Sequence, residues 1–287
     1  MMESILVTGA SGQLGKAVVG ALLEKGFTVR AATRNTAGIK WSDRLRPVLF
    51  DYEDSSLYGA ALDNISDVFL VAPPLDFQAP AKLIPFIDRA RDEGIRYIVF
   101  NSAMRADLDE KNPLRIIERH LMKSGLDYTI LRPNFFMENF SAGWLAPMVG
   151  AGRLRVPAGE ARTSFISVED IARVAAACFE ERRYGEDCSL TGRQALSYGE
   201  AARVLSEVCG RKVDYIPMTE AEMEQDARRQ GMPESAIRYM AELFAMVRRG
   251  FMADTTGVIA EVTRRPPLSF REFAEKNIST CGIRKAA

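Results

Sequence analysis

The sequence predicts an α/β protein, with a doubly wound parallel sheet followed by a smaller, mainly helical carboxy-terminal part. Three observations support this prediction. Short apolar strands alternate with amphipathic helices in the first half of the chain. The first strand runs into a glycine-rich turn that opens a helix. In the second half of the chain, helix-capping motifs dominate. The length of 287 residues also allows a main domain with a smaller second domain.

The first strand-turn-helix unit lies at the amino end. Residues 5–7 are apolar and precede the glycine turn, after which Leu14, Val18 and Leu22 recur at helical spacing up to Gly26. The alternation then continues, with strands expected at residues 28–33, 67–71, 96–101 and 128–131 and helices near 55–62, 81–93 and 112–125. Because these strands are mostly apolar throughout, we expect a parallel sheet that is covered by helices on both faces.

Beyond residue 133 the pattern changes. Capping boxes are expected to open helices after Ser167, Ser197, Thr219 and Ser269, because each of these residues precedes an acidic residue by three positions. The few strands expected in this part lie at residues 187–191 and 213–216.

Charge and cysteine content exclude several classes of protein. Lys plus Arg and Asp plus Glu each total 38, so no overall field attracts nucleic acid or an anionic membrane. The four cysteines form no C-x-x-C pair, which favours reduced thiols over a disulfide framework and predicts no metal site. Since we see neither a signal peptide nor a membrane-spanning run, we expect a cytoplasmic monomer or homodimer that binds a small-molecule substrate.

The turn after the first strand is a candidate phosphate site. Its context, between a strand and a helix, lets the backbone approach a pyrophosphate whose charge the free N–H groups of the helix stabilise. We therefore expect a Rossmann-type domain that binds a nicotinamide dinucleotide, and the alternative is a turn that binds nothing. The residues expected to contact the cofactor here are Gly9, Ala10, Ser11, Gly12, Gln13 and Leu14.

The end of the second strand indicates which dinucleotide is bound. Enzymes that use NAD place an acidic residue about 20 residues past the glycines, whereas this chain has Thr33, Arg34 and Asn35 there. A guanidinium suits the 2′-phosphate that an acid would repel, so NADP(H) is expected in preference to NAD(H). Alternatively, Arg34 extends along the surface at a strand end. Arg30 and Lys40 are further candidates for the phosphate contact.

Two later segments resemble the NmrA-like family of atypical short-chain dehydrogenase/reductases. They are LDYTILRPNFFMEN, at residues 126–139, and FISVEDIA, at residues 165–172. The G-x-x-G-x-x-G spacing of the turn fits the same superfamily. The family contains triphenylmethane reductase, NAD(P)H quinone reductases and ergot-alkaloid dehydrogenases, and it also contains a nucleotide-sensing regulator.

The resemblance implies further contacts at the carboxyl ends of the strands. Asp51 and Tyr52 would border the adenine. Ser102 follows the strand expected at residues 96–101, where short-chain reductases hold a Ser or Thr beside the nicotinamide, so it is the candidate catalytic residue; alternatively it caps the strand. The remaining residues expected to face the cofactor are Val71, Ala72, Pro73, Asn101, Pro133 and Phe135.

The Tyr-x-x-x-Lys pair of many short-chain reductases is missing, and Leu114 or Arg115 stands where some relatives keep the lysine. The resemblance therefore implies hydride delivery to an acceptor that is already electrophilic, such as a quinone, an imine or an iminium ion. The residues expected to contact this aromatic or cyclic acceptor are Asn134, Phe136, Met137 and Asn139. Aromatic runs are, however, also typical of a core.

Together these features predict an NAD(P)-binding Rossmann domain over residues 1–155, with residues 164–192 returning to it, and a smaller substrate-binding domain over residues 193–287. A competing hypothesis is a regulator of the NmrA type that senses NAD(P) without turnover. A third hypothesis keeps the fold but makes the protein an epimerase or carbonyl reductase whose acid is relocated to Tyr128 or Tyr198.

Overall fold

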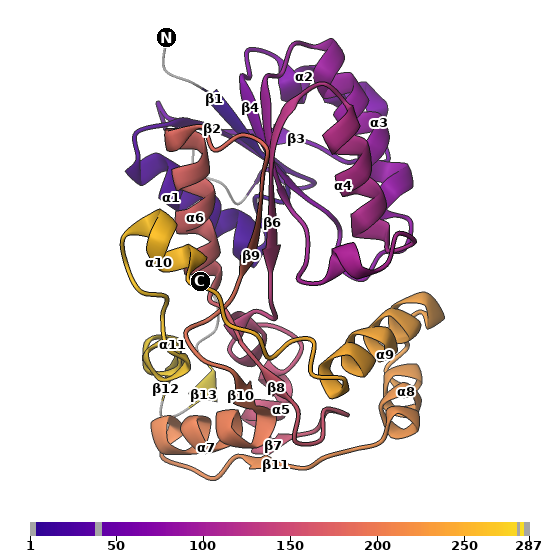
Figure 1. Cartoon of the computed structure of the whole chain (residues 1–287), viewed down its shortest axis with the longest axis vertical. Helices are drawn as coiled ribbons and strands as arrows, with labels where there is room; N and C mark the ends of the chain where they lie inside the picture. Colours follow the sequence, from indigo (N-terminus) through magenta and orange to yellow (C-terminus); the bar gives the residue numbers. More distant parts are fainter. Residues whose placement is uncertain (1–3, 38–41, 280–281, 284–287) are drawn as a thin grey trace. The chain divides into compact units, whose positions relative to one another are not determined.

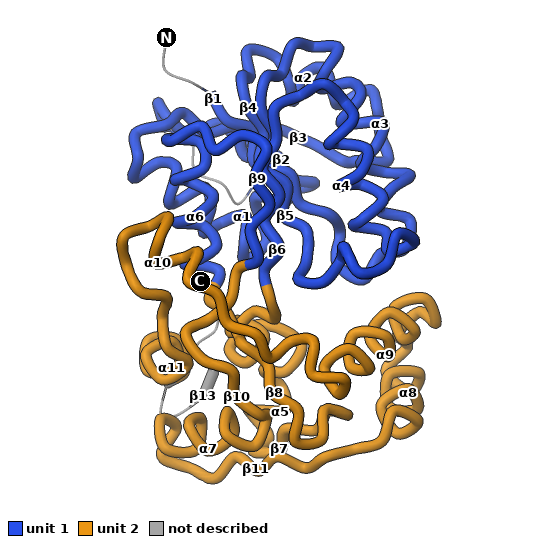
Figure 2. The backbone as a smooth tube through the Cα atoms, viewed as in Figure 1, with its two compact units in different colours: residues 1–133, 168–189 blue, residues 134–167, 190–287 orange. Residues whose placement is uncertain are grey.

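The computed structural model describes residues 4–37, 42–279 and 282–283. The chain folds as two compact units, unit 1 with residues 1–133 and 168–189, and unit 2 with residues 134–167 and 190–287 (Figure 2). The first boundary therefore falls at Pro133 and not at the expected residue 155. The reason is that the segment after Pro133 bonds within unit 2, as when Asn134 Nδ2 donates to the Met252 carbonyl oxygen at 2.9 Å.

Unit 1 contains the main sheet, in which the strand order is β3-β2-β1-β4-β5-β6-β9. All the pairs among the first six strands of this sheet are parallel. Because β1 has β2 on one side and β4 on the other, the order reverses between β1 and β4, which is where such sheets bind ligands. The strands are β1 (Ser4–Val7), β2 (Thr28–Thr33), β3 (Leu45–Leu49), β4 (Asp67–Val71), β5 (Tyr97–Asn101), β6 (Asp127–Pro133) and β9 (Glu186–Leu190).

Helices cover both faces of this sheet, which confirms the predicted doubly wound fold. On one face lie α1 (Gln13–Glu24) and α6 (Val168–Glu181) (Figure 1). On the other lie η1 (Ser55–Leu57), α2 (Tyr58–Leu62), α3 (Ala79–Asp92) and α4 (Pro113–Lys123), and η2 (Ala106–Leu108) precedes α4. The core beneath α3 and α4 joins Leu70 and Phe100 of the strands to Phe86 and Ile117 of the helices. Removing these apolar side chains from water holds the layers together.

Unit 2 is mainly helical, as predicted. Its helices are η3 (Met137–Phe140), α5 (Ala146–Gly150), α7 (Tyr198–Cys209), α8 (Glu220–Arg229), α9 (Glu234–Arg248), α10 (Val258–Thr263) and α11 (Phe270–Asn277). Three short strand pairs accompany them: β7 (Arg153–Leu154) with β11 (Asp214–Tyr215), β8 (Arg162–Thr163) with β10 (Leu196–Ser197), and β12 (Ile278–Ser279) with β13 (Gly282–Ile283).

An aromatic cluster forms the centre of unit 2. The ring of Phe140 packs edge-on against those of Phe165 and Phe270, with centroids 5.1 and 5.0 Å away. Three of the predicted capping boxes are formed in full, at the starts of α7, α8 and α11. At the fourth position, the Ser167 hydroxyl donates to Glu138 Oε1 at 3.0 Å.

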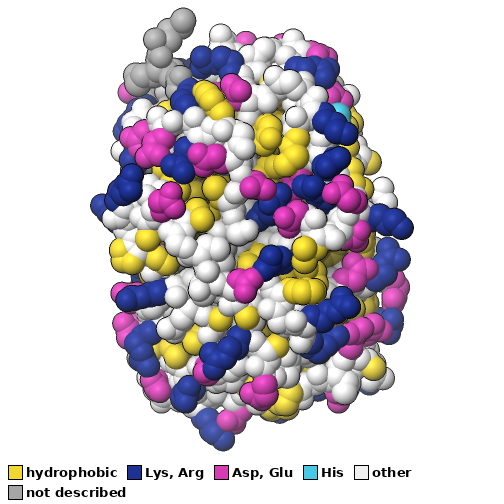
Figure 3. All heavy atoms as spheres, viewed as in Figure 1, with side chains coloured by type: hydrophobic (Ala, Val, Ile, Leu, Met, Phe, Trp, Pro, Cys, Tyr) yellow, Lys and Arg dark blue, Asp and Glu magenta, His cyan; other side chains and the backbone are white. Residues whose placement is uncertain are grey.

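The surface carries charges of both signs. Basic and acidic side chains are interspersed over the face shown in Figure 3, in keeping with the net charge of zero. Cys178, Cys188 and Cys209 are buried thiols, as expected, while Cys281 lies outside the described residues. Across the part of the chain that the structure describes, no helix has both the length and the apolar content that crossing a bilayer requires.

Candidate functional site

The turn between β1 and α1 has the geometry of a phosphate-binding turn. Gly9 has a φ of +61°, in the left-handed region that favours glycine. A Cβ on Gly15 would lie 2.1 Å from the Gly9 carbonyl oxygen, so glycine is required for α1 to pass this close to the turn. Ala10 and Leu14 are buried and anchor the turn, whereas Ser11, Gly12 and Gln13 are exposed. The amino end of α1 therefore opens toward solvent.

Beside this turn, unit 1 has a cavity of about 380 Å³, within the range of small-molecule sites. It lies at the carboxyl ends of β1, β2 and β4 and brings together predicted residues from four separate segments. The predicted residues that line it are Gly9, Ser11, Gly12, Arg34, Asp51, Tyr52, Val71, Ala72 and Pro73. The lining residues that the sequence analysis missed are Ala32, Thr33, Phe50, Glu53, Pro74 and Lys82.

Arg34 is exposed, lines this cavity and makes no ion pair with another described residue. Next to it, the Thr33 hydroxyl lies 3.1 Å from the Ser11 hydroxyl. Arg30, by contrast, donates to the carbonyl oxygens of Ala60 and Asp63 at 3.0 and 2.6 Å. Its guanidinium is therefore used within the fold, and Lys40 lies outside the described residues.

Tyr52 joins the loop after β3 to the end of β4. Its hydroxyl donates to the Val71 carbonyl oxygen at 2.9 Å, and burial raises the pKa of this phenol. Its ring packs edge-on against Phe50 and Phe86, with centroids 4.9 and 5.8 Å away. Tyr52 thus forms a fixed wall of the cavity.

Lys82 is a cavity residue for which the sequence carries no local signal. Its ammonium lies 2.7 Å from Glu53 Oε1 and 2.9 Å from Asp76 Oδ2, and these hydrogen bonds raise the pKa of Lys82. The two acids belong to the loops after β3 and β4, so only the folded chain brings them to the helix. Lys82 therefore neutralises Glu53 where that acid lines the cavity.

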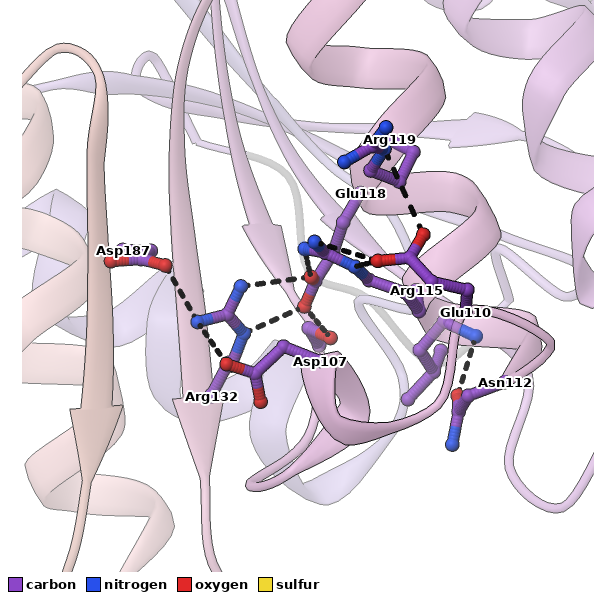
Figure 4. A network of polar contacts seen from close by, with 10 residues as sticks. Asp107, Glu110, Asn112, Arg115, Glu118, Arg119, Arg132 and Asp187 are labelled. Carbon is purple, nitrogen blue, oxygen red and sulfur yellow. Dashed lines mark hydrogen bonds and ion pairs between the residues drawn. The ribbon is translucent and has the colours of Figure 1, made fainter.

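A buried network of charges lies at the carboxyl end of β5 and β6 (Figure 4). The Ser102 hydroxyl donates to Glu118 Oε1 at 2.6 Å, and Glu118 is fully buried on α4. Arg132 donates to both oxygens of this carboxylate, from Nε at 2.9 Å and from Nη2 at 2.8 Å. Arg115 adds a third contact, from Nη1 to Oε2 at 3.0 Å. Glu118 is thus held by two arginines and a serine.

These contacts decide the charge state of Glu118. Burial alone would raise the pKa of its carboxyl, but the hydrogen bonds from Arg132, Ser102 and Arg115 outweigh burial and lower it. Arg132 has a further partner in Asp187, whose Oδ2 lies 2.7 Å from Nη1. Glu118 is therefore an ionised carboxylate, and the charge of Arg132 is compensated.

Other predicted residues do not line this cavity. Asn101 is buried at the end of β5, and its Oδ1 accepts no hydrogen bond from any described residue. Pro133 ends β6. Asn134 belongs to unit 2, where its Nδ2 donates to Ser164 Oγ at 2.7 Å and to the Met252 carbonyl oxygen. The other predicted residues of unit 2 are Phe135, Phe136, Met137 and Asn139. The roles given to all these residues stay predictions.

Neither tyrosine of the third hypothesis is placed as a catalytic acid. Tyr128 lies near the amino end of β6, whereas ligands on such sheets bind beyond the carboxyl ends of the strands. Tyr198 is fully buried, so its hydroxyl reaches no open site. The positions of both residues oppose an epimerase or carbonyl reductase that depends on them.

Comparisons with known proteins agree with this architecture. A family model described as "NmrA-like family" matches residues 1–254. The chain is 31% identical over 284 residues to Prestalk A differentiation protein A of Dictyostelium discoideum, a match covering 96% of this chain and 93% of that protein. It is 29% identical to the NAD(P)H azoreductase of Xenophilus azovorans, with 97% and 99% covered. Among solved structures, an NADPH-dependent quinone oxidoreductase of Escherichia coli shares the fold, with a TM-score of 0.82, 23% identity, and 95% and 99% covered. The chain therefore belongs to the NmrA-like family.

Proposed function

We propose that this protein is an NADPH-dependent oxidoreductase that delivers hydride to an electrophilic aromatic or cyclic acceptor, such as a quinone or an imine. The observation that carries the proposal is the cavity of unit 1, where the glycine turn and Arg34 meet at the switch point of the sheet. A relative that is 29% identical over nearly the whole chain is named an NAD(P)H azoreductase, which supports the same reaction class.

The residues present fit such a cofactor. The close approach of α1 at Gly15 brings the amino end of the helix against the turn, where the helix would stabilise a pyrophosphate, and the first turn of α1 contains no acidic residue to repel it. Arg34 would bind the 2′-phosphate, with the Ser11 and Thr33 hydroxyls beside it. Tyr52 would border the adenine. The bound nicotinamide supplies the hydride, and the protein supplies its orientation.

The proposed class of hydride acceptor follows from the absence of the Tyr-x-x-x-Lys pair from α4. Arg115, which stands in the region of the missing lysine, is bound through Nη1 to Glu118 at 3.0 Å and through Nη2 to Glu110 at 3.1 Å. Glu118 itself is ionised and buried. Neither side chain is poised to donate a proton to a reacting oxygen. An acceptor that is electrophilic before it binds does not require such a donor.

The test is calorimetric titration of NADPH and NADH into the wild type and Arg34→Ala. A hydrogen bond to a charged group contributes about 1.5–3 kcal/mol, so the Kd for NADPH should rise about 10- to 100-fold in the variant. NADH has no 2′-phosphate and serves as the internal control, and its Kd should change little. An unchanged NADPH preference would remove Arg34 from the site.

A nucleotide-sensing regulator remains the second candidate, because a relative that matches over nearly its whole length is named for differentiation and not for a reaction. The two functions separate in one assay, the oxidation of NADPH with a panel of quinones and imines. Oxidation supports the reductase. Binding of NADPH without oxidation of any acceptor supports the regulator, and failure of both dinucleotides to bind contradicts both functions.

A further inference from the structure

The polar side chains at the end of β5 leave hydrogen-bond acceptors that the proposed function does not explain. Asn101 pairs with Val71 of β4 in the parallel register, so Ser102 follows beside Ala72, which lines the cavity. Neighbouring strands lie about 4.8 Å apart. Ser102 therefore stands one strand away from the cavity wall, at the same carboxyl edge of the sheet.

The hydroxyl proton of Ser102 is already used in a hydrogen bond to Glu118. An ionised carboxylate accepts hydrogen bonds and donates none, so across the 2.6 Å contact the proton must point from Ser102 to Glu118. Arg132 and Arg115 keep Glu118 in this ionised form by holding both of its oxygens. A serine oxygen carries one proton and two lone pairs. What remains for any other partner of Ser102 is a pair of acceptor sites.

A second acceptor lies next to it. Asn101 turns its Nδ2 toward the Ser102 carbonyl oxygen, at 3.4 Å, and leaves Oδ1 without a partner among the described residues. Asn101 is 8% exposed, and a buried acceptor without a donor is costly. Consecutive residues of a strand point to opposite faces, so the two acceptors flank the strand end. Both lack a donor that the described part of the protein supplies.

We propose that Ser102 is a hydrogen-bond acceptor for an N–H group of a bound molecule, and that Glu118 is the positioning residue that fixes this direction. The proposal rests on the proposed function. The ligand group is a planar N–H donor, which belongs either to the carboxamide of the nicotinamide ring or to the acceptor substrate. Ser102 therefore differs from a serine that donates to a substrate oxygen, because a developing oxyanion here would face lone pairs.

The first arm of the test compares NADPH with its reduced 3-acetylpyridine analogue, in which a methyl group replaces the amino group of the carboxamide. We expect the wild type to bind NADPH about tenfold more tightly than the analogue, as one hydrogen bond allows. Ser102→Ala should lose this preference, and Ser102→Thr, which keeps the hydroxyl, should restore it. The readout is a Kd from fluorescence titration, which requires no turnover.

Glu118→Gln tests the positioning role. A glutamine oxygen in the place of Oε2 can still accept from Arg132 Nη2 and Arg115 Nη1. The amide nitrogen in the place of Oε1 then donates to Ser102 and turns the hydroxyl proton outward, and the hydrogen bond from Arg132 Nε is lost. We expect this variant to lose the preference for NADPH over the analogue although Ser102 is intact. Thermal melting shows whether the variant folds, and if it does not, the two Ser102 variants still decide the proposal.

The second arm identifies the source of the N–H group. It compares kcat/KM for a protonated cyclic imine, which carries an N–H, with that for its N-methyl iminium counterpart. A preference for the N–H acceptor that disappears in Ser102→Ala assigns the contact to the substrate. If Ser102→Ala alters neither preference, the proposal is overturned while NADPH binding and the proposed function stand. If the wild type binds no dinucleotide, the proposed function fails and this inference fails with it.

Discussion

Gly15 offers the most direct test of the cofactor turn. In Gly15→Ala the new Cβ would lie 2.1 Å from the Gly9 carbonyl oxygen and 2.7 Å from the α-carbon of Ala10. Backbone atoms, not flexible side chains, are the obstacle, so the turn itself has to retreat by about 1 Å. Overpacking of this kind costs about 1–3 kcal/mol.

Gly20→Ala is the matched control, because Gly20 lies in the same helix and its Cβ would meet nothing within 4 Å. Both variants gain the same helix propensity, about 1 kcal/mol. Their difference therefore isolates the clash, and Gly15→Ala should melt several degrees below Gly20→Ala, at about 2–4 °C per kcal/mol.

Thermal unfolding followed by circular dichroism measures this difference, and titration with NADPH measures its effect on the site. Because Gly9 lines the cavity, the displaced turn should bind NADPH more weakly in Gly15→Ala, whereas Gly20→Ala should bind it as the wild type does. Equal melting temperatures and equal affinities of the two variants would show that the close approach of α1 has no part in binding.

Three further predictions concern stability. The pKa of Glu118 is lowered from its ordinary value of 4.5, so the stabilisation by its charge is full above about pH 4.5 and is lost as the pH falls through the folded value. The melting temperatures of the wild type and Glu118→Gln should therefore differ most near pH 7 and converge in acid. Tyr198→Phe removes a buried hydroxyl that has no partner among the described residues and should not lower the melting temperature, whereas Tyr97→Phe breaks a buried 2.6 Å hydrogen bond and should cost about 0.5–1.5 kcal/mol. If Tyr198→Phe loses activity at full stability, Tyr198 would again be a candidate catalytic acid. Ser197→Ala removes the cap of α7 and should lower the free energy of unfolding, measured in urea, by about 0.5–2 kcal/mol.

Elements with strong local signals were predictable from the sequence. The expected strand at residues 67–71 coincides with β4 (Asp67–Val71), because a fully buried parallel strand is a continuous apolar run. The helix expected from residue 81 begins two residues earlier, at Ala79, since proline is tolerated in the first turn. The cavity was predictable for a similar reason, because the glycine turn and Arg34 each follow directly from a strand end.

Features that depend on distant residues were not predictable. Glu118 lies three residues after Arg115 on a helix and has the spacing of a surface ion pair. Glu118 is instead buried, and it is bound by Arg132, which approaches from β6. The two-residue strands β7, β8 and β10 carry too short a pattern to detect, and they exist because partners elsewhere in the chain pair with them. The unit boundary at Pro133 was missed for the same reason.

The path of the chain between the two units has a consequence for synthesis on the ribosome. Residues 134–167 join unit 2 before residues 168–189 return to complete unit 1 with α6 and β9. Until that return, the nascent unit 1 has an unpaired edge at β6 and lacks the helix that packs against α1. A fragment that stops at residue 133 therefore exposes a strand edge and an apolar face to its neighbours, and it should aggregate when expressed alone.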